Sequence, residues 1–255
     1  MMKADAQPGR SRPLRMRSLV LKCRLADAAE LQAIFQELLD VEGPASVGFL
    51  NQHGYNLARR DPAAYEAFDA LDVIFRDGIG MALACRAFGL DAKDNLNGTD
   101  LIPALIEFAS SSLGPRVQFF AYGTSEPWLK RGGDALFNGR EFHSLDGFRE
   151  PAEYLQHFRA HVPARGQAIV VLGMGMPKQE AVANLIRTAV QTDVLLICGG
   201  AILDFKARRF TRAPRFLRLI RAEWLYRLLL EPRRLFNRYV IGIPAFLLAV
   251  AKDRR

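Results

Sequence analysis

Apolar residues in the first 200 positions alternate between two patterns, short continuous runs and longer stretches with helical spacing. The short runs predict strands at residues 19–23, 45–50, 72–75, 117–122, 169–172 and 194–198. Helical spacing predicts helices at residues 28–39, 62–71, 79–88, 98–110, 126–137, 151–161 and 177–190. Strands separated by helices of about ten residues or more indicate βαβ units. The pattern therefore predicts an α/β fold with a mostly parallel sheet.

Polar and glycine-rich segments follow five of the predicted strands. They are Asn51, Asp77, Gly123-Thr124, residues 173–180 and residues 199–204. Ligands of open α/β sheets bind outside the carboxyl ends of the strands, so we expect these segments to meet at one crevice. The alternative is that strand-to-helix turns collect such residues for caps and turns alone. Five segments together favour a site.

The segment after residues 169–172 combines several of these signals. Gly173 and Gly175 mark the turn that ends the strand, and Pro177 can occupy the first turn of the following helix. A strand, a glycine turn and a helix N-terminus together form a place where an anion can bind. For the predicted helix at residues 98–110, we expect Thr99 or Asp100 to be the cap.

Composition narrows the compartment and the kind of chemistry. The three cysteines are far apart, which argues against a disulfide framework or a zinc site and favours a reducing cytosol. Residues 1–17 are polar and arginine-rich without an apolar core, so they predict a disordered leader rather than a secretory signal. The chain has no complete G-x-G-x-x-G, no P-loop, no Asp-x-Asp and no G-x-S-x-G.

The net charge of +8 is concentrated near the C-terminus. Residues 205–238 hold eleven Lys and Arg against two Glu, a net charge of +9. We therefore divide the chain into the leader, a catalytic body at residues 18–204, and a basic, helical, amphipathic appendage at residues 205–255. Such asymmetry points to phosphates of a nucleotide, a nucleic acid or a membrane lipid.

The appendage has the pattern of a membrane-surface helix. Its apolar stripe, interleaved with arginines, comprises Phe216, Leu217, Leu219, Ile220, Trp224, Leu225, Leu228 and Leu229. Residues 240–250 are apolar but too short for a span, which needs about 20 residues. We expect the protein to lie on an anionic membrane surface. The alternative is that the stripe packs on the body as ordinary core.

A set of motifs extends from residue 50 to residue 234. They are Leu50-Asn51-Gln52-His53, Asp77-Gly78-Ile79-Gly80, Gly98-Thr99-Asp100-Leu101, Gly123, Gly173-x-Gly175-x-Pro177-Lys178-Gln179-Glu180, Gly199-Gly200-Ala201-x-x-Asp204-Phe205, Arg212-Ala213-Pro214, Glu223-Trp224-Leu225-Tyr226-Arg227-Leu228 and Glu231-Pro232-Arg233-Arg234. In order and spacing, they resemble the WecG/TagA/CpsF glycosyltransferases.

The resemblance implies a Rossmann-like body with helices on both faces of the sheet and a C-terminal appendage. It implies inverting transfer of a sugar, typically an N-acetylhexosamine or a relative, from a UDP donor to a polyprenyl-diphosphate-linked sugar. No metal or other cofactor is needed, and the family acts at the cytoplasmic membrane face in exopolysaccharide and other surface-polysaccharide biosynthesis. The identity of the sugar stays open, since Phe49 and Asn95 depart from the pattern of many relatives. Whether the chain forms a homo-oligomer also stays open.

Two residues match catalytic positions of the family. Asp77 matches the proposed general base, which takes a proton from the acceptor hydroxyl. Its alternative role is a helix cap. Asn51 matches a loop residue that binds sugar or acceptor, and its alternative role is an Asx turn.

The resemblance also implies a donor site. Its expected residues are Thr99, Asp100, Gly123, Gly173, Gly175, Lys178, Gln179, Glu180, Gly199, Asp204, Arg227, Arg234 and Arg238. Without a metal, arginines are the groups that can stabilise the departing UDP. Lys178 and the arginines have the alternative of a solvated helix surface, and Glu180 has that of a capping carboxylate.

Two other functions fit parts of the sequence. A dinucleotide-binding oxidoreductase could use the same sheet, although the third glycine of its fingerprint is replaced by Lys178. A nucleic-acid-binding module would rest on the basic segment with its interleaved aromatic residues. We expect no nucleic-acid partner, because the interleaved Leu and Ile fit a lipid-facing helix better.

Overall fold

A computed structural model describes residues 11–162, 165–210, 214, 223–230 and 232–254. Within these residues one seven-stranded sheet forms in the order β1-β3-β2-β7-β6-β4-β5, and every neighbouring pair is parallel. The strands are β1 (Cys23–Arg24), β2 (Pro44–Leu50), β3 (Val73–Arg76), β4 (Val117–Gly123), β5 (Phe142–Leu145), β6 (Gln167–Gly173) and β7 (Val194–Cys198). The predicted α/β fold with a parallel sheet is confirmed.

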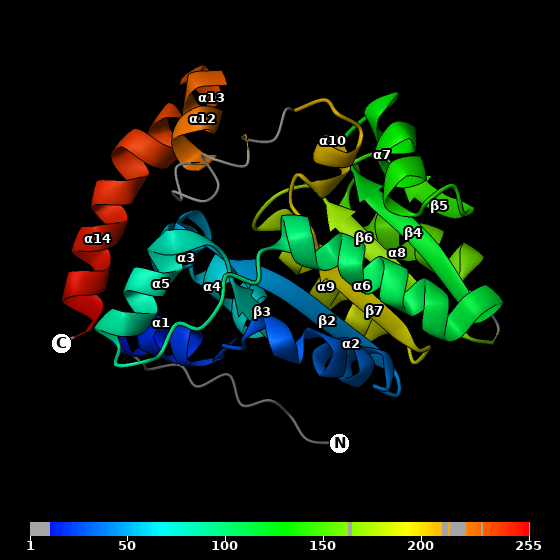
Figure 1. Ribbon diagram of the computed structural model, residues 1–255, viewed down its shortest axis with the longest axis horizontal. Helices are drawn as coiled ribbons and strands as arrows, with labels where there is room; N and C mark the ends of the chain where they lie inside the picture. The colour runs from blue at the N-terminus through cyan, green and yellow to red at the C-terminus, as the bar shows by residue number, and fades with distance from the viewer. Residues whose placement is uncertain (1–10, 163–164, 211–213, 215–222, 231, 255) are drawn as a thin grey trace.

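Helices cover both faces of the sheet (Figure 1). One face carries α1 (Arg12–Leu21), α3 (Gln52–Arg60), α4 (Pro62–Asp69), α5 (Gly78–Ala87), α8 (Pro151–His161), α9 (Lys178–Ala189) and α14 (Gly242–Asp253). The other carries α2 (Leu31–Leu39), α6 (Gly98–Leu113), α7 (Trp128–Leu136) and α10 (Ile202–Lys206). Short turns η1 (Ala28–Glu30) and η2 (Gly114–Arg116) precede α2 and β4. The chain ends with α12 (Glu223–Leu230), α13 (Pro232–Phe236), the π-helical turn η3 (Asn237–Ile241) and α14.

Burial on both faces explains the continuous apolar run of β6. Val170 and Leu172 pack into the core beneath α8 and α9, whereas Ile169 and Val171 pack into the core beneath α6 and α7. Because successive side chains of a strand point to opposite faces, a strand covered on both sides has no polar positions left. The run therefore identified the sheet's centre.

The sheet has a topological switch point between β2 and β7. These strands are neighbours, but α3 follows β2 on one face while α10 follows β7 on the other. At such a point the two connections diverge and leave a crevice at the carboxyl ends of the strands, where open α/β sheets bind ligands. Asn51 follows β2 there, and Gly199 follows β7.

The last helix of the predicted appendage packs into the body. Phe246, Ala249 and Val250 of α14 are buried in the same core as α3 and α5. The buried carboxylate of Asp253 accepts hydrogen bonds from the Tyr55 hydroxyl and Arg59 Nε, both at 2.8 Å. Breaking such a buried pair by removing one partner costs about 3–5 kcal/mol. For α14, the alternative of core packing therefore holds on one helix face.

The opposite side of this region exposes apolar side chains. Of the fifteen large hydrophobic residues that are exposed among the described residues, nine lie between positions 224 and 248. They are Trp224, Leu225, Leu229, Leu230, Phe236, Val240, Ile241, Leu247 and Leu248. In the part of the chain that the structure describes, no helix has the length and apolar character to cross a membrane. The predicted stripe between residues 216 and 220 lies outside the described residues.

Three predictions from the sequence need correction. Residues from Arg12 to Leu21 form α1 with Met16, Leu19 and Val20 buried, so the leader is not disordered from Arg12 on. The first strand is only Cys23–Arg24, because this apolar run packs as a helix face. At α6, neither Thr99 nor Asp100 is the cap. Asn97 is, and its Oδ1 accepts from the Asp100 N–H at 3.2 Å.

Candidate active site

A cavity of about 540 Å³ opens at the carboxyl ends of β2 and β3. Its walls come from Asn51, Asp77, the first two turns of α5, the loop at residues 92–97, and the C-terminal helices. A larger hollow, about 1300 Å³, lies at the amino ends of β4 and β5, and no candidate residue lines it. We assign the site to the smaller cavity, because parallel sheets bind ligands at the carboxyl ends of their strands.

Asp77 lies at the entrance of α5. Its backbone N–H donates to the Leu50 carbonyl at 2.8 Å, which ties the end of β3 to the end of β2. Asp77 is the N-cap residue by position, but its side chain makes no capping hydrogen bond. Asp77 therefore does not act as a side-chain cap of α5 in this structure. Its half-buried side chain lines the cavity.

A clamp built from Arg76 and Asn95 fixes the turn that carries Asp77. The buried guanidinium of Arg76 donates to the carbonyls of Ala92 at 2.5 Å and Lys93 at 2.6 Å. Asn95 Oδ1 accepts from the Gly78 N–H at 2.7 Å and from Arg76 Nη1 at 3.3 Å. Gly78 has a φ of 82°, a conformation that favours glycine. The clamp thus holds the backbone on both sides of Asp77.

Asn51 caps α3 and also lines the cavity. Its Oδ1 accepts from the N–H groups of His53 and Gly54, both at 3.0 Å, so it caps α3. Its Nδ2 has no hydrogen-bond partner among the described residues, and the residue lines the cavity. A side chain fixed by its oxygen can offer its amide N–H groups to a ligand.

Besides Arg76, two arginines line the same cavity. Arg238 comes from η3, and together with burial and Arg60 it lowers the pKa of His53 to about 4. The guanidinium of Arg86, from α5, makes no hydrogen bond or ion pair with any described residue. The pattern search missed Arg86, which only its exposed position on α5 identifies. Two other predicted arginines, Arg227 and Arg234, have side chains outside the described part of the structure.

Thr99 and Asp100, the two predicted site residues at the start of α6, differ in whether they line the cavity. Thr99, at the start of α6, lines the cavity. Asp100 does not line it, and its carboxylate accepts a hydrogen bond from Asn97 Nδ2 at 2.9 Å. Asp100 therefore takes part in the capping arrangement of α6.

The predicted glycines lie at the ends of β4, β6 and β7, away from this cavity. A Cβ on Gly123 would come within 2.4 Å of the Gly173 carbonyl oxygen, so the two strand ends approach too closely for a side chain. Gly175 follows β6 and Gly199 follows β7 at the same edge of the sheet. These strand ends present backbone rather than side chains.

Gln179 and Glu180 are fully buried at the start of α9. Gln179 accepts from the Gly200 N–H at 2.9 Å and donates to Glu180 Oε1 at 2.8 Å. Glu180 Oε2 has no hydrogen-bond partner among the described residues, and burial raises the pKa of this carboxyl to about 7. Both side chains lie in the protein interior beneath the loop after β7, which Gln179 holds through Gly200, and neither is exposed to solvent.

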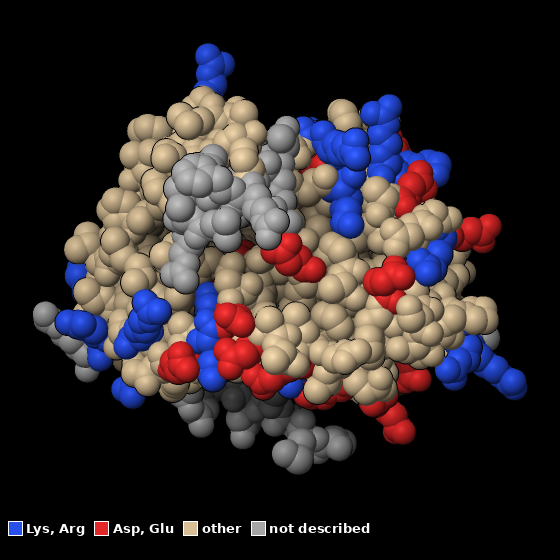
Figure 2. Space-filling model, in the orientation of Figure 1, with Lys and Arg blue, Asp and Glu red and all other residues tan. Residues whose placement is uncertain are grey.

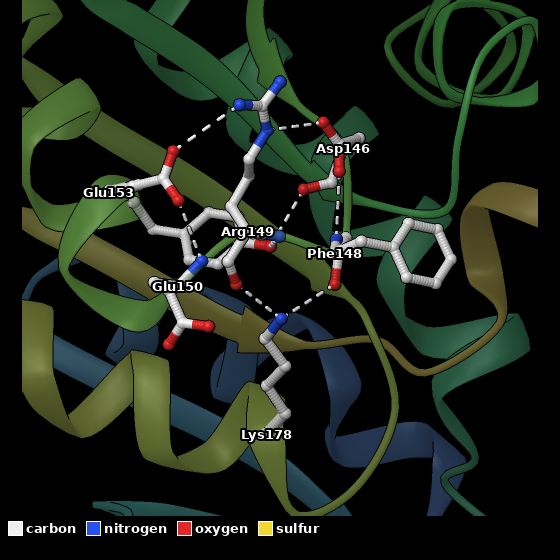
Figure 3. Close-up of polar contacts among 8 residues, drawn as sticks. Asp146, Phe148, Arg149, Glu150, Glu153 and Lys178 are labelled. Atoms are coloured by element: carbon white, nitrogen blue, oxygen red, sulfur yellow. Dashed lines mark hydrogen bonds and ion pairs between the residues drawn. The ribbon is translucent and has the colours of Figure 1, made fainter.

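Lys178 anchors the loop after β5 (Figure 3). Its Nζ donates to the carbonyls of Gly147 at 3.0 Å and Arg149 at 2.6 Å. The Arg149 guanidinium donates to Asp146 at 2.7 Å, which closes the loop on itself. The result is a fixed loop whose Phe148 ring points away from these contacts and is 78% exposed. Sequence reasoning missed Phe148, because an isolated aromatic residue in a loop has no periodicity to mark it.

Asp204 belongs to a separate cluster beyond β7. Its carboxylate accepts from Thr124 Oγ1 at 2.7 Å and from Arg209 Nη1 at 3.2 Å. The Arg209 guanidinium lies 5.9 Å from the ring centre of Trp128. No motif pointed to Trp128, and Arg209 appeared only as one of the eleven basic residues of the segment 205–238.

Charge is distributed unevenly over the view in Figure 2. Lys and Arg gather over α7 and α10, where Lys130, Arg131, Arg208 and Arg209 are exposed. The flank of α12 and α14 has few charged side chains in this view. Among the described residues, no group of three or more His, Cys, Asp or Glu could hold a metal ion.

Comparison with known proteins gives a family and one curated relative. The model of the glycosyl transferase WecG/TagA/CpsF family matches residues 18–255. An N-acetylglucosaminyldiphosphoundecaprenol N-acetyl-beta-D-mannosaminyltransferase of Bacillus spizizenii is 27% identical over 203 residues. That alignment covers 78% of this chain and 75% of the relative.

Proposed function

This chain belongs to the WecG/TagA/CpsF family of glycosyltransferases, and we propose that it transfers an N-acetylhexosamine or related sugar from a UDP donor to a polyprenyl-diphosphate-linked sugar. The observation that carries the proposal is a cavity at the carboxyl ends of β2 and β3 that is lined by Asp77, Asn51 and three arginines. The relative's name supports the acceptor class and an N-acetylated amino sugar. Family membership favours this function over a dinucleotide-dependent oxidation.

The proposed reaction is a single inverting displacement. The oxygen of an acceptor hydroxyl attacks the anomeric carbon from the side opposite UDP, while Asp77 takes the hydroxyl proton. The bond from that carbon to the UDP oxygen breaks, and the electron pair leaves with UDP. A positioned carboxylate of this kind contributes about 10²–10⁴-fold to a rate.

In this proposal, arginines stabilise the charge of the departing UDP, a role that a metal ion could otherwise fill. Negative charge develops on the β-phosphate as UDP departs, and groups already aimed at that charge lower the barrier. Arg227 and Arg234 are proposed to contact the departing UDP, while Arg238 and Arg86, which line the cavity, are left for the diphosphate of the acceptor. No metal ion or other cofactor is proposed.

The donor nucleotide is proposed to lie along the ends of β4, β6 and β7. Backbone at Gly123, Gly173, Gly175 and Gly199 leaves room for it, while the exposed ring of Phe148 offers a face on which a base can stack. The cations over α7 and α10 would raise the local concentration of an anionic donor. Lys178, Gln179, Glu180 and Asp204 support this pocket through the loops that they hold.

We propose that the protein lies on the inner face of the cytoplasmic membrane. The exposed apolar side chains of α12, α13 and α14 support this location, as does the relative's undecaprenol-linked acceptor. Basic residues near an anionic surface would add about 1 kcal/mol each. The full-length protein should sediment with anionic vesicles and be released by salt.

A transfer assay tests the proposal directly. Full-length protein is incubated in EDTA with a panel of UDP-sugars and a short-chain polyprenyl-diphosphate N-acetylglucosamine, and the product is weighed by mass spectrometry. We expect a product heavier by one N-acetylhexosamine residue, with a new β-linkage by NMR. Activity that appears only with Mg²⁺ or Mn²⁺ would remove the metal-independent part. Absence of product with every donor would contradict the function.

A further inference from the structure

The cavity of Asp77 continues into a groove between α5 and α14. Figure 1 shows the two helices along the same flank, and they are in contact. Gly80 lies at this contact, because a Cβ there would be 3.5 Å from Phe246 Cε1. The buried Phe246 forms part of the cavity wall at this point.

Apolar side chains line both walls of this groove. Ile79 and Leu83 are four residues apart on α5, and they are 41% and 44% exposed. Ile243 and Leu247 are four residues apart on α14, and Leu247 is 46% exposed. Side chains four apart lie on the same helix face. All four residues line the cavity that holds Asp77.

In each wall, a charged residue precedes a pair of aliphatic residues along the chain. Asp77 immediately precedes α5, and Ile79 and then Leu83 follow it. Arg238 in η3 immediately precedes α14, and Ile243 and then Leu247 follow it. The arrangement has a carboxylate and a guanidinium at one end, four aliphatic side chains beyond them, and the exposed Arg86 one turn past Leu83. A ligand that matches it has a polar, anionic head and a hydrocarbon tail.

We propose that the α5–α14 groove binds the first isoprene units of the acceptor, with the diphosphate beside Arg238. This inference rests on the proposed function and assigns the lipid part of its acceptor to a place on the protein. Aliphatic side chains that are exposed in the free protein become buried against the isoprenoid chain. Removing apolar surface from water drives such binding, and one buried methylene changes an equilibrium constant about fourfold.

Binding of short isoprenoid diphosphates tests the groove without requiring transfer. Calorimetry in detergent-free buffer compares inorganic diphosphate, dimethylallyl diphosphate and farnesyl diphosphate below its micelle concentration. For the wild-type chain, we expect farnesyl diphosphate to bind at least about tenfold more tightly than dimethylallyl diphosphate, given the methylene contribution. Leu83→Asn and Leu247→Asn should reduce that ratio to within about twofold, whereas binding of inorganic diphosphate stays the same.

Leu248→Asn is the matched control. Leu248 is the next residue of α14 and is 64% exposed, but it does not line the cavity. The control should keep the wild-type ratio, and melting temperatures should show that all three variants fold. Equal affinity of the wild type for the three diphosphates, or an equal loss in the control, would overturn the proposal.

UDP binding and sugar transfer are measured on the same samples. A chain-length effect that depends on Leu83 and Leu247 supports the groove even if no sugar is transferred, in which case only the proposed function fails. Transfer activity together with no chain-length effect leaves the proposed function standing and removes the groove.

Discussion

The two halves of the sheet's carboxyl edge use polar residues in different ways. On the β2–β3 side, Asp77, Asn51 and Arg238 line an open cavity. On the β4–β6–β7 side, Gln179 and Glu180 are fully buried, and Asp204 is bonded to Thr124 and Arg209. The first half presents side chains to a ligand, whereas the second presents mainly backbone and an exposed aromatic ring.

The difference shows why a polar residue after a strand is an ambiguous signal. A side chain that is already satisfied by the protein has fewer groups left for a ligand, and a buried one has none that can reach it. We therefore expect substitutions on the β2–β3 side to affect turnover first, and buried substitutions on the β4–β6–β7 side to affect stability first.

The largest effect is expected at Asp77. Asp77→Asn should reduce turnover by about 10²–10⁴-fold while UDP binding is kept, because the variant loses the proposed proton acceptor but not the donor site. Steady-state rates and UDP calorimetry measure the two quantities. Asp40→Asn, an exposed carboxylate at the amino edge of β2, serves as the control and should keep the wild-type rate. A fully active Asp77→Asn would place the reaction elsewhere.

A smaller effect is expected from pH at Glu180. Burial raises the folded-state pKa to about 7 from an ordinary 4.5, so the folded protein holds this proton more tightly than the unfolded chain. Stability should therefore fall as pH rises between these values and stay reduced above them, by about 3 kcal/mol in total.

Glu180→Gln keeps the neutral state at every pH. The variant should match the wild type at about pH 4 and below and exceed it in stability by about 3 kcal/mol near pH 8, as measured by urea unfolding. An unchanged pH dependence in the variant would show that Glu180 is not the group responsible. Such a result would weaken the contrast between the two halves.

The smallest effect is expected at Phe148. Phe148→Ala should weaken UDP binding by about 1 kcal/mol, the lower part of the range for base stacking on an aromatic ring, without lowering turnover at saturating donor. Because the ring is exposed, its removal should leave the stability of the folded protein unchanged, and thermal melting checks this. Competition between UDP and inorganic diphosphate gives the control, since only UDP carries the base.

The sequence predicted the sheet well because β2, β6 and β7 are buried on both faces and read as continuous apolar runs. It misplaced the N-terminal helix, since the apolar part of α1 is too short to distinguish a helix from a strand. It did not predict α3, whose residues form a polar cluster in the chain.

The candidate site was predictable where a motif names the residue and hidden where tertiary packing decides. Asp77, Asn51 and Thr99 came from the family-like motifs, Arg238 came from the donor site that the resemblance implies, and all four line one cavity. Pattern alone could not place Gln179 in the core, because its partner Gly200 is twenty-one residues away. Arg86 and Phe148 were missed since exposure, not spacing, distinguishes them.

The central claim is that chemistry occurs at the β2–β3 side while the donor nucleotide is held at the β4–β6–β7 side. A crystal structure of the full-length chain with an unreacted UDP-sugar and no acceptor tests it most directly. The account predicts the sugar in the cavity, with its anomeric carbon facing Asp77, and the uracil beside the loop that carries Phe148. A sugar bound outside the cavity, or a uracil at the β3 end of the sheet, would contradict it.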